Sequence, residues 1–161
     1  MLGTIEEEHD GFTKTLLEAG DGIDEYGTVV GRPSMGDWVK IHYKGRVVST
    51  GQEFEDTYHR QKPTHFQIGG PYWLTDIKPT WNRGLVKAAQ TMTLGDKCRL
   101  EIKSKFAYGA RGTKSEYGEV PPNEDIVLEC ELVEINGHSS QQKEGWISCS
   151  TTTWNICGVI Y

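Results

Sequence analysis

Residues 36–45 have the sequence GDWVKIHYKG, in which apolar and polar side chains alternate, with Val39, Ile41 and Tyr43 on one side. A period of two is typical of a β-strand that has one buried face. The same alternation recurs at residues 98–103 and 126–132. We therefore predict three half-buried antiparallel strands.

Two shorter strands and one helix complete the pattern. Residues 12–17 suit an outer strand, and Phe66 and Ile68 mark another. The spacing i, i+3, i+4, i+7 of a helix occurs at Leu85, Ala88, Ala89 and Met92, with Asn82 available as a cap and Gly95 as the end. This order predicts an α+β domain in which one helix covers a curved antiparallel sheet, and it disfavours a nucleotide-binding βαβ fold.

The composition favours one compact domain and disfavours several kinds of partner. A chain of 161 residues can bury a single core, and its net charge of -6 repels nucleic acid. We find no secretory leader and no apolar run near the roughly 20 residues that cross a bilayer, so we expect a cytoplasmic monomer without a membrane partner. Cysteines and histidines lack ligand spacing, so we expect free thiols and no metal site.

Shifts in composition divide the chain into three parts. We expect a flexible N-terminal extension at residues 1–10 and the patterned domain at 11–136. The Ser-, Thr- and Gln-rich residues 137–161 are expected to form a weakly structured C-terminal tail.

Three separate stretches resemble one known family. They are GDWVKIHYKG at 36–45, FAYGA at 106–110 and VPPN at 120–123, in matching order and spacing. They resemble the FKBP-type peptidyl-prolyl cis-trans isomerases, which are immunophilins. The resemblance implies a five-stranded antiparallel half-barrel sheet wrapped around one short helix. It also implies rotamase activity in protein folding, chaperone activity and no cofactor, with proline-containing peptides or proteins and tacrolimus- or rapamycin-type macrolides as partners.

Isomerisation of an X-Pro bond needs a particular kind of pocket. Rotation gives up amide resonance, a barrier of about 18–20 kcal/mol, and a dry apolar cavity favours the less polar twisted amide. By resemblance, Tyr108 donates its phenol to the substrate carbonyl, and the catalytic set is Tyr108, Tyr43, Phe54 and Glu55. The substrate-binding set is Phe66, Leu85, Val120, Leu128, Trp81 and Tyr117. Taken singly, aromatic residues on strands are more often ordinary core residues.

The sequence departs from the family at several of these positions. Glu55 stands where Asp is usual, Thr64 where an aromatic residue is common, and Leu85 and Leu128 where Trp and Phe are frequent. The loops at 70–83 and 111–119 are enlarged, and Tyr117 either leans over the pocket mouth or is simply exposed. Two interpretations stay open: a proline isomerase, or a catalytically weak binding module or chaperone for proline-containing partners.

Overall fold

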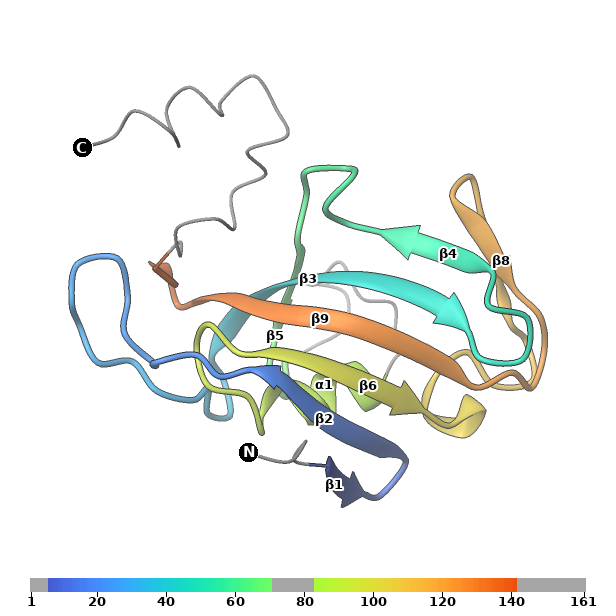
Figure 1. Cartoon of the computed structure of the whole chain (residues 1–161), viewed down its shortest axis with the longest axis horizontal. Coiled ribbons are helices and arrows are strands. Elements are labelled where there is room, and N and C mark those ends of the chain that lie inside the picture. The colour runs from blue at the N-terminus through green and yellow to red at the C-terminus, as the bar shows by residue number, and fades with distance from the viewer. Residues whose placement is uncertain (1–5, 71–82, 142–161) are drawn as a thin grey trace.

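An antiparallel sheet with a short helix behind it dominates the structure (Figure 1). The computed structural model describes residues 6–70 and 83–141. Their strands are β1 (Glu6–His9), β2 (Phe12–Glu18), β3 (Trp38–Val47), β4 (Glu53–Asp56), β5 (Thr64–Gln67), β6 (Lys97–Ile102), β7 (Thr113–Ser115), β8 (Gly118–Val120), β9 (Ile126–Ile135) and β10 (His138–Ser139). Their helices are α1 (Arg83–Ala89) and the single 3-10 turn η2 (Ser104–Phe106).

The strand order confirms the predicted fold class. The main sheet runs β1-β2-β6-β9-β3-β4, with β5 also paired to β3 and β10 to β9, and β7 and β8 form a separate hairpin. The five strands expected from the sequence are β2, β3, β5, β6 and β9. The main sheet of the described residues has eight strands rather than five because short segments add to its edges and ends.

The hydrophobic core lies between the sheet and α1. Along β3, Val39, Ile41 and Tyr43 are buried while the residues between them are partly exposed. Leu85 and Ala88 of α1 are fully buried, and α1 packs against β2 and β6. Burying one large aliphatic side chain contributes about 1.5–3 kcal/mol, so this two-layer packing is the main source of stability. No helix in the described ranges is long and apolar enough to cross a bilayer.

The helix ends earlier than the sequence predicts. It stops at Ala89, although Met92, three residues on, is also fully buried. After Ala89 the chain tightens into turns of the i to i+3 kind, in which the Met92 N–H donates to the Ala89 carbonyl. The Lys14 ammonium also binds the Thr91 carbonyl at 3.1 Å and so caps this end. Asn82, the expected N-cap, lies outside the described residues.

The expected flexible extension at residues 1–10 contains a strand. Glu6–His9 forms β1 and pairs with β2 across the two residues Asp10 and Gly11. Gly11 has a positive φ of 92°, which glycine adopts without steric cost. The sheet therefore begins before the boundary at residue 11.

The expected tail from residue 137 also starts in regular structure. Asn136 and Gly137 both have positive φ, 50° and 83°, as a tight hairpin turn requires, and β10 folds back on β9. Asp24 accepts hydrogen bonds from the Thr28 N–H and from Nδ1 of His138 in β10, both at 2.7 Å. This carboxylate ties the loop after β2 to the end of the described chain. Residues 142–161 lie outside the described residues.

Candidate functional site

Three aromatic side chains from separate segments meet at one end of the core. Tyr43 comes from the inner face of β3, Phe54 from β4, and Tyr108 from the turn after η2. The rings of Phe54 and Tyr108 lie edge to face, with centroids 5.7 Å apart and an angle of 87°. Such pairs contribute about 0.5–1.5 kcal/mol beyond their buried area, so the two rings fix each other's position.

The hydroxyl groups of Tyr43 and Tyr108 are buried close to the Glu55 charge. Burial, with the nearby Glu55 charge as a smaller cause, raises the pKa of Tyr43 well above its ordinary value. Burial likewise raises the pKa of Tyr108, as do the neighbouring Tyr43 and Glu55. Both phenols therefore stay protonated around neutral pH and can donate hydrogen bonds.

Most of the expected substrate-binding residues join the same cluster. Phe66, Leu85, Val120 and Leu128 belong to one continuous core with the three rings, and each is at most 1% exposed. The structure brings these four residues together, and their binding role stays a prediction. Trp81 lies outside the described residues.

The Glu55 side chain is paired with Arg60, a residue that the sequence did not single out. Its carboxylate accepts a hydrogen bond from Arg60 Nε at 2.9 Å, and the same guanidinium lies over the Tyr117 ring, 4.9 Å from its centroid. Arg60 thus links β4 to the β7–β8 hairpin. Arg60 lies in the turn after β4, where no periodic pattern points to it. Its one signal in the sequence is a charge opposite to that of Glu55, five residues earlier.

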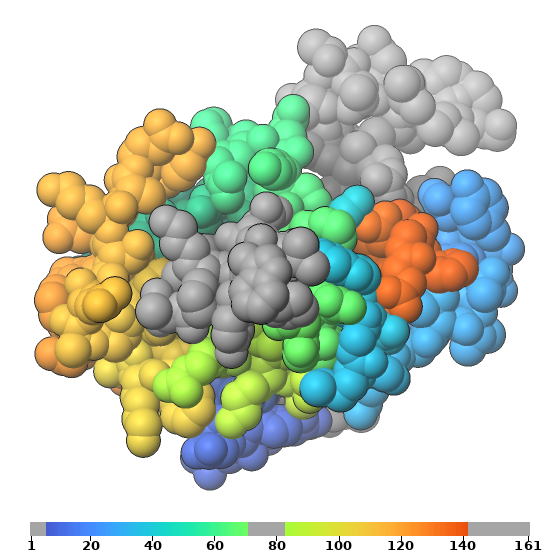
Figure 2. Space-filling view, turned by 180° about the vertical axis from the view of Figure 1, so that it is seen from behind, coloured from blue at the N-terminus to red at the C-terminus, as the bar shows by residue number. Residues whose placement is uncertain are grey.

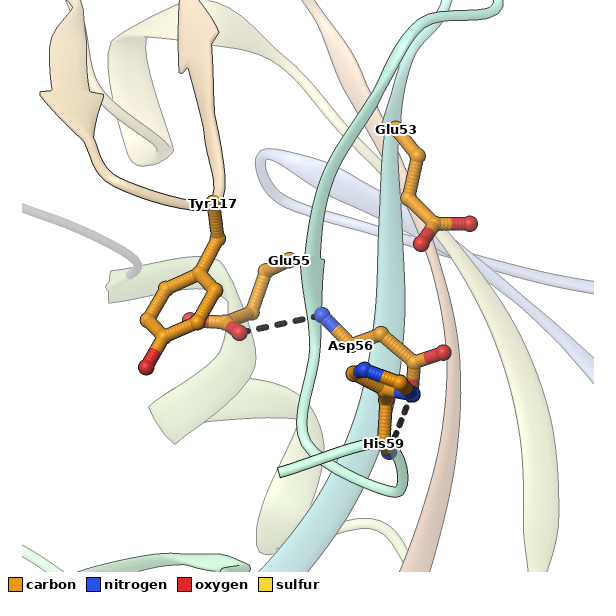
Figure 3. A pocket seen from close by; sticks show the side chains of 5 residues that line it. All are labelled: Glu53, Glu55, Asp56, His59 and Tyr117. Atoms are coloured by element: carbon orange, nitrogen blue, oxygen red, sulfur yellow. Dashed lines mark hydrogen bonds between the residues drawn. The ribbon is translucent and has the colours of Figure 1, made fainter.

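A cleft of about 290 Å³ is lined by residues of β4, of the turn after it and of the turn between β7 and β8 (Figure 3). Its walls are Glu53, Glu55, Asp56, His59 and Tyr117, and Figure 3 shows the Tyr117 ring facing the Glu55 carboxylate. The segment expected as a loop at 111–119 is largely the β7–β8 hairpin. Figure 2 shows this hairpin, in orange, at one end of the molecule. Tyr117 is 48% exposed at its turn. The carboxylates make this cleft too polar to receive a proline ring.

Gly118 explains how the hairpin comes so close to β4. A Cβ atom added there would lie 2.6 Å from the Phe54 Cα atom, which no side chain could avoid without moving a backbone. The glycine therefore brings β8 against β4 and places Val120 in the core beside Phe54.

His42, on the outer face of β3, has a structural role. Its ring is 2.8 Å from Thr57 Oγ1 and stacks on Tyr58, and burial lowers the pKa of His42. Among the described residues no group of three or more His, Cys, Asp or Glu side chains could hold a metal ion. Cys98 and Cys130 are buried free thiols.

The chain matches one family of known proteins over its patterned domain. The family model described as FKBP-type peptidyl-prolyl cis-trans isomerase matches residues 30–133. The FK506-binding protein 1A of Aspergillus fumigatus is 34% identical over 126 residues, which cover 78% of this chain and 96% of that protein. The chain belongs to the FKBP family. The FK506-binding protein 2 of Aspergillus oryzae is also similar to this FKBP, with 35% identity over 107 residues that cover 66% of this chain and 71% of that protein.

Solved structures agree with the fold of this FKBP. The N-terminal domain of FKBP42 from Arabidopsis thaliana superposes with a TM-score of 0.65 at 21% identity, covering 84% of this chain and 94% of that one. FkpA from Escherichia coli gives a TM-score of 0.61 at 25% identity, over 84% of this chain and 53% of that one. The protein is therefore an FKBP-type enzyme that isomerises X-Pro peptide bonds, as the sequence predicted.

Proposed function

We propose that Tyr108 holds the substrate carbonyl while the rings of Tyr43 and Phe54 receive the proline. The observation that supports this assignment is the meeting of the three rings from three separate segments. Tyr108 is the most exposed of them, at 8% against 3% for Phe54 and 1% for Tyr43. A bound peptide can therefore reach its hydroxyl with the least rearrangement.

The chemistry is a change of environment rather than a covalent step. An apolar wall destabilises the planar amide relative to the twisted one, because twisting removes the charge separation of resonance. A protonated phenol holds the carbonyl oxygen while the proline side of the bond rotates. The raised pKa of Tyr108 keeps that donor available around neutral pH.

We also propose that the site binds macrolides of the tacrolimus and rapamycin type more weakly than a site with all the family's rings would, while proline-containing peptides still bind. Thr64, Leu85 and Leu128 stand at positions where rings are frequent in the family. Ring contacts contribute about 0.5–1.5 kcal/mol each beyond buried area, so their loss weakens a large ligand that touches all three walls. A short peptide depends mainly on Tyr108, Tyr43 and Phe54.

A binding module or chaperone with poor turnover is the second candidate. The observation in its favour is that Glu55, a residue assigned to catalysis, is held by Arg60. Binding of a proline peptide without any change in its isomerisation rate would favour this candidate. Chaperone activity, a cytoplasmic location and a monomeric state stay predictions, which aggregation assays, cell fractionation and sedimentation would test.

The test follows cis-to-trans conversion of a short Xaa-Pro peptide with catalytic amounts of the protein. We expect acceleration by the wild type, and in Tyr108→Phe a fall in kcat/KM of about tenfold, the equivalent of one lost hydrogen bond. The melting temperature should change by only a few degrees, because the ring that packs on Phe54 remains. Equal turnover in both proteins would refute the role of Tyr108. Added tacrolimus shows whether the same pocket accepts the macrolide.

A further inference from the structure

A buried threonine lies where the neighbour of β3 changes from one strand to another. Along one edge of β3, β5 pairs as far as Ile41 and β4 pairs from Lys44 onward. Tyr43 lies between these two paired stretches, opposite Thr57, the first residue after β4. Thr57 is 0% exposed although its side chain is polar. A buried polar side chain is expected to have hydrogen-bond partners, and those of Thr57 are atoms of Tyr43 and His42.

The Thr57 hydroxyl takes the place of a backbone carbonyl in the sheet. Two residues that face each other in a hydrogen-bonded antiparallel pair normally exchange two backbone bonds. The Thr57 N–H does donate to the Tyr43 carbonyl at 3.0 Å, but the Tyr43 N–H donates to Thr57 Oγ1 at 2.8 Å. The Thr57 carbonyl instead accepts from the Lys62 N–H at 3.1 Å and closes the turn that contains Arg60. The hydroxyl therefore lets the chain leave the sheet while the Tyr43 N–H keeps a partner.

The same hydroxyl is fixed from the outer face of the sheet. His42 Nδ1 lies 2.8 Å from Thr57 Oγ1, and the His42 ring stacks on Tyr58 with centroids 4.6 Å apart. The Tyr58 hydroxyl donates to the Glu131 carboxylate of β9 at 3.0 Å. Thr57 is thus held between the outer face and the backbone of Tyr43, whose ring lies in the core.

We infer that Thr57 is a positioning residue for isomerisation, because its hydroxyl holds the Tyr43 backbone and so places the ring that receives the proline. This inference rests on the role proposed above for Tyr43. Without the hydroxyl, the buried Tyr43 N–H would lose its partner, and β3 would have to move toward another acceptor or toward water. The Tyr43 ring would then shift against the rings of Phe54 and Tyr108.

Thr57→Val tests the inference, because valine keeps the shape of threonine and removes the hydroxyl. A displacement of about 1 Å in an active site can cost about a hundredfold in rate. We expect a smaller shift here, and a fall of about tenfold in kcat/KM for an Xaa-Pro peptide. Thr57→Ser keeps the hydroxyl and should retain most of the activity. If valine prevents folding, Thr57→Cys takes its place, since a thiol is only a weak acceptor, and it should again be less active than Thr57→Ser.

Thr91→Val is the matched control, in the turn after α1. The Thr91 hydroxyl donates to the Ala88 carbonyl at 2.7 Å and accepts from the Lys14 ammonium at 3.1 Å. The same chemical change there should lower the melting temperature by a few degrees and leave kcat/KM unchanged. It separates loss of stability from loss of positioning.

A double-mutant cycle with Tyr43→Leu shows whether Thr57 acts through the Tyr43 ring. Leucine keeps an apolar side chain and the backbone N–H, so Thr57→Val should still lower the melting temperature in this background. Its effect on kcat/KM should disappear, because the ring that Thr57 positions is gone.

Three results would overturn the inference while the wild type is active. They are unchanged kcat/KM in Thr57→Val, equal losses in Thr57→Val and Thr57→Ser, or an undiminished effect of Thr57→Val on kcat/KM in the Tyr43→Leu background. A wild type that does not accelerate isomerisation, or full turnover in Tyr43→Leu alone, would instead refute the proposed function or the proposed role of Tyr43, and this inference with it. The two kinds of failure are therefore distinguishable in one set of assays.

Discussion

A methyl group added at Gly45 would test how closely the Phe54 ring is held in the site. Gly45 lies in β3 and pairs with Glu55 of β4 and Leu128 of β9. A Cβ atom there would lie 2.5 Å from Phe54 Cζ and 2.9 Å from two further ring atoms. Carbon atoms in contact are normally about 3.5–4.0 Å apart. The ring must therefore move by about 1 Å to accept the methyl group.

The expected loss of stability is moderate. Overpacking a core costs about 1–3 kcal/mol. Gly45 does not have a positive φ, so alanine fits the strand, and its smaller freedom in the unfolded chain offsets about 0.4–1 kcal/mol. The net loss of about 1–2 kcal/mol corresponds to a fall of about 3–8 °C in melting temperature.

The expected loss of activity is larger, because Phe54 sits edge-on against Tyr108 at 5.7 Å. Misplacing a group in an active site by about 1 Å can reduce the rate by about a hundredfold. We therefore expect Gly45→Ala to lower kcat/KM for an Xaa-Pro peptide by about ten- to a hundredfold. Calorimetry on the same samples gives the stability.

A second variant separates the two effects. Adding Phe54→Leu to Gly45→Ala makes room for the methyl group, so the melting temperature should recover while turnover stays low. Unchanged kcat/KM in Gly45→Ala, with a lowered melting temperature, would show that the position of the Phe54 ring does not matter for catalysis.

Two other properties follow from buried titratable groups. Burial alone would raise the pKa of Asp24, but hydrogen bonds from His138 and from backbone N–H groups lower it below the ordinary value of 3.8. The ionised Asp24 therefore contributes its full stabilisation of the folded state above about pH 4, and this contribution is lost as the pH falls through the folded pKa. In urea titrations, Asp24→Asn should lose less stability than the wild type between about pH 5 and pH 3, and parallel curves would contradict this. Burial raises the pKa of Cys98 to about 12 and that of Cys130 well above its ordinary value. Iodoacetamide at pH 8 should therefore label neither thiol until urea unfolds the chain, as peptide mass spectrometry would show.

The sheet could be predicted because its long strands alternate over most of their length. In β3, and in β9 from Ile126 to Leu132, every second residue is buried against the core, and the two strands pair along their length. The alternation of β9 changes phase at Val133, where the register shifts. A one-residue slip would expose the whole apolar set of either strand. Alternation in the sequence therefore determines the buried face and much of the register.

Two of the strands that were not predicted, β1 and β10, had a local signal of a different kind. β1 joins β2 through Asp10-Gly11, and β9 joins β10 through Asn136-Gly137. Both dipeptides are typical of two-residue hairpins. β1 and β10 are short and most of their residues are exposed, so composition alone made both ends of the domain resemble unstructured chain.

The site was predictable in its apolar part and not in its polar contacts. Phe54, Phe66 and Leu128 reach one cluster because each is the inward residue of a strand that the core requires. Arg60 takes its role from partners in other segments of the chain, since its guanidinium lies over the Tyr117 ring and donates to the Glu55 carboxylate. No spacing along one strand encodes such contacts, which exist only after the sheet has folded.

The substitutions relative to the family are of two kinds, apolar and polar. Leu85 and Leu128 replace rings with smaller apolar groups and are fully buried, so the floor of the site stays dry. Exclusion of water favours the twisted amide, and an apolar side chain can exclude water without an aromatic ring. Thr64 instead places a polar side chain, which is buried, at the start of β5. Substitutions that weaken recognition of a large ligand can therefore accumulate on these walls, while Tyr108 and Phe54 keep the ring packing that we propose for rotation of the X-Pro amide bond.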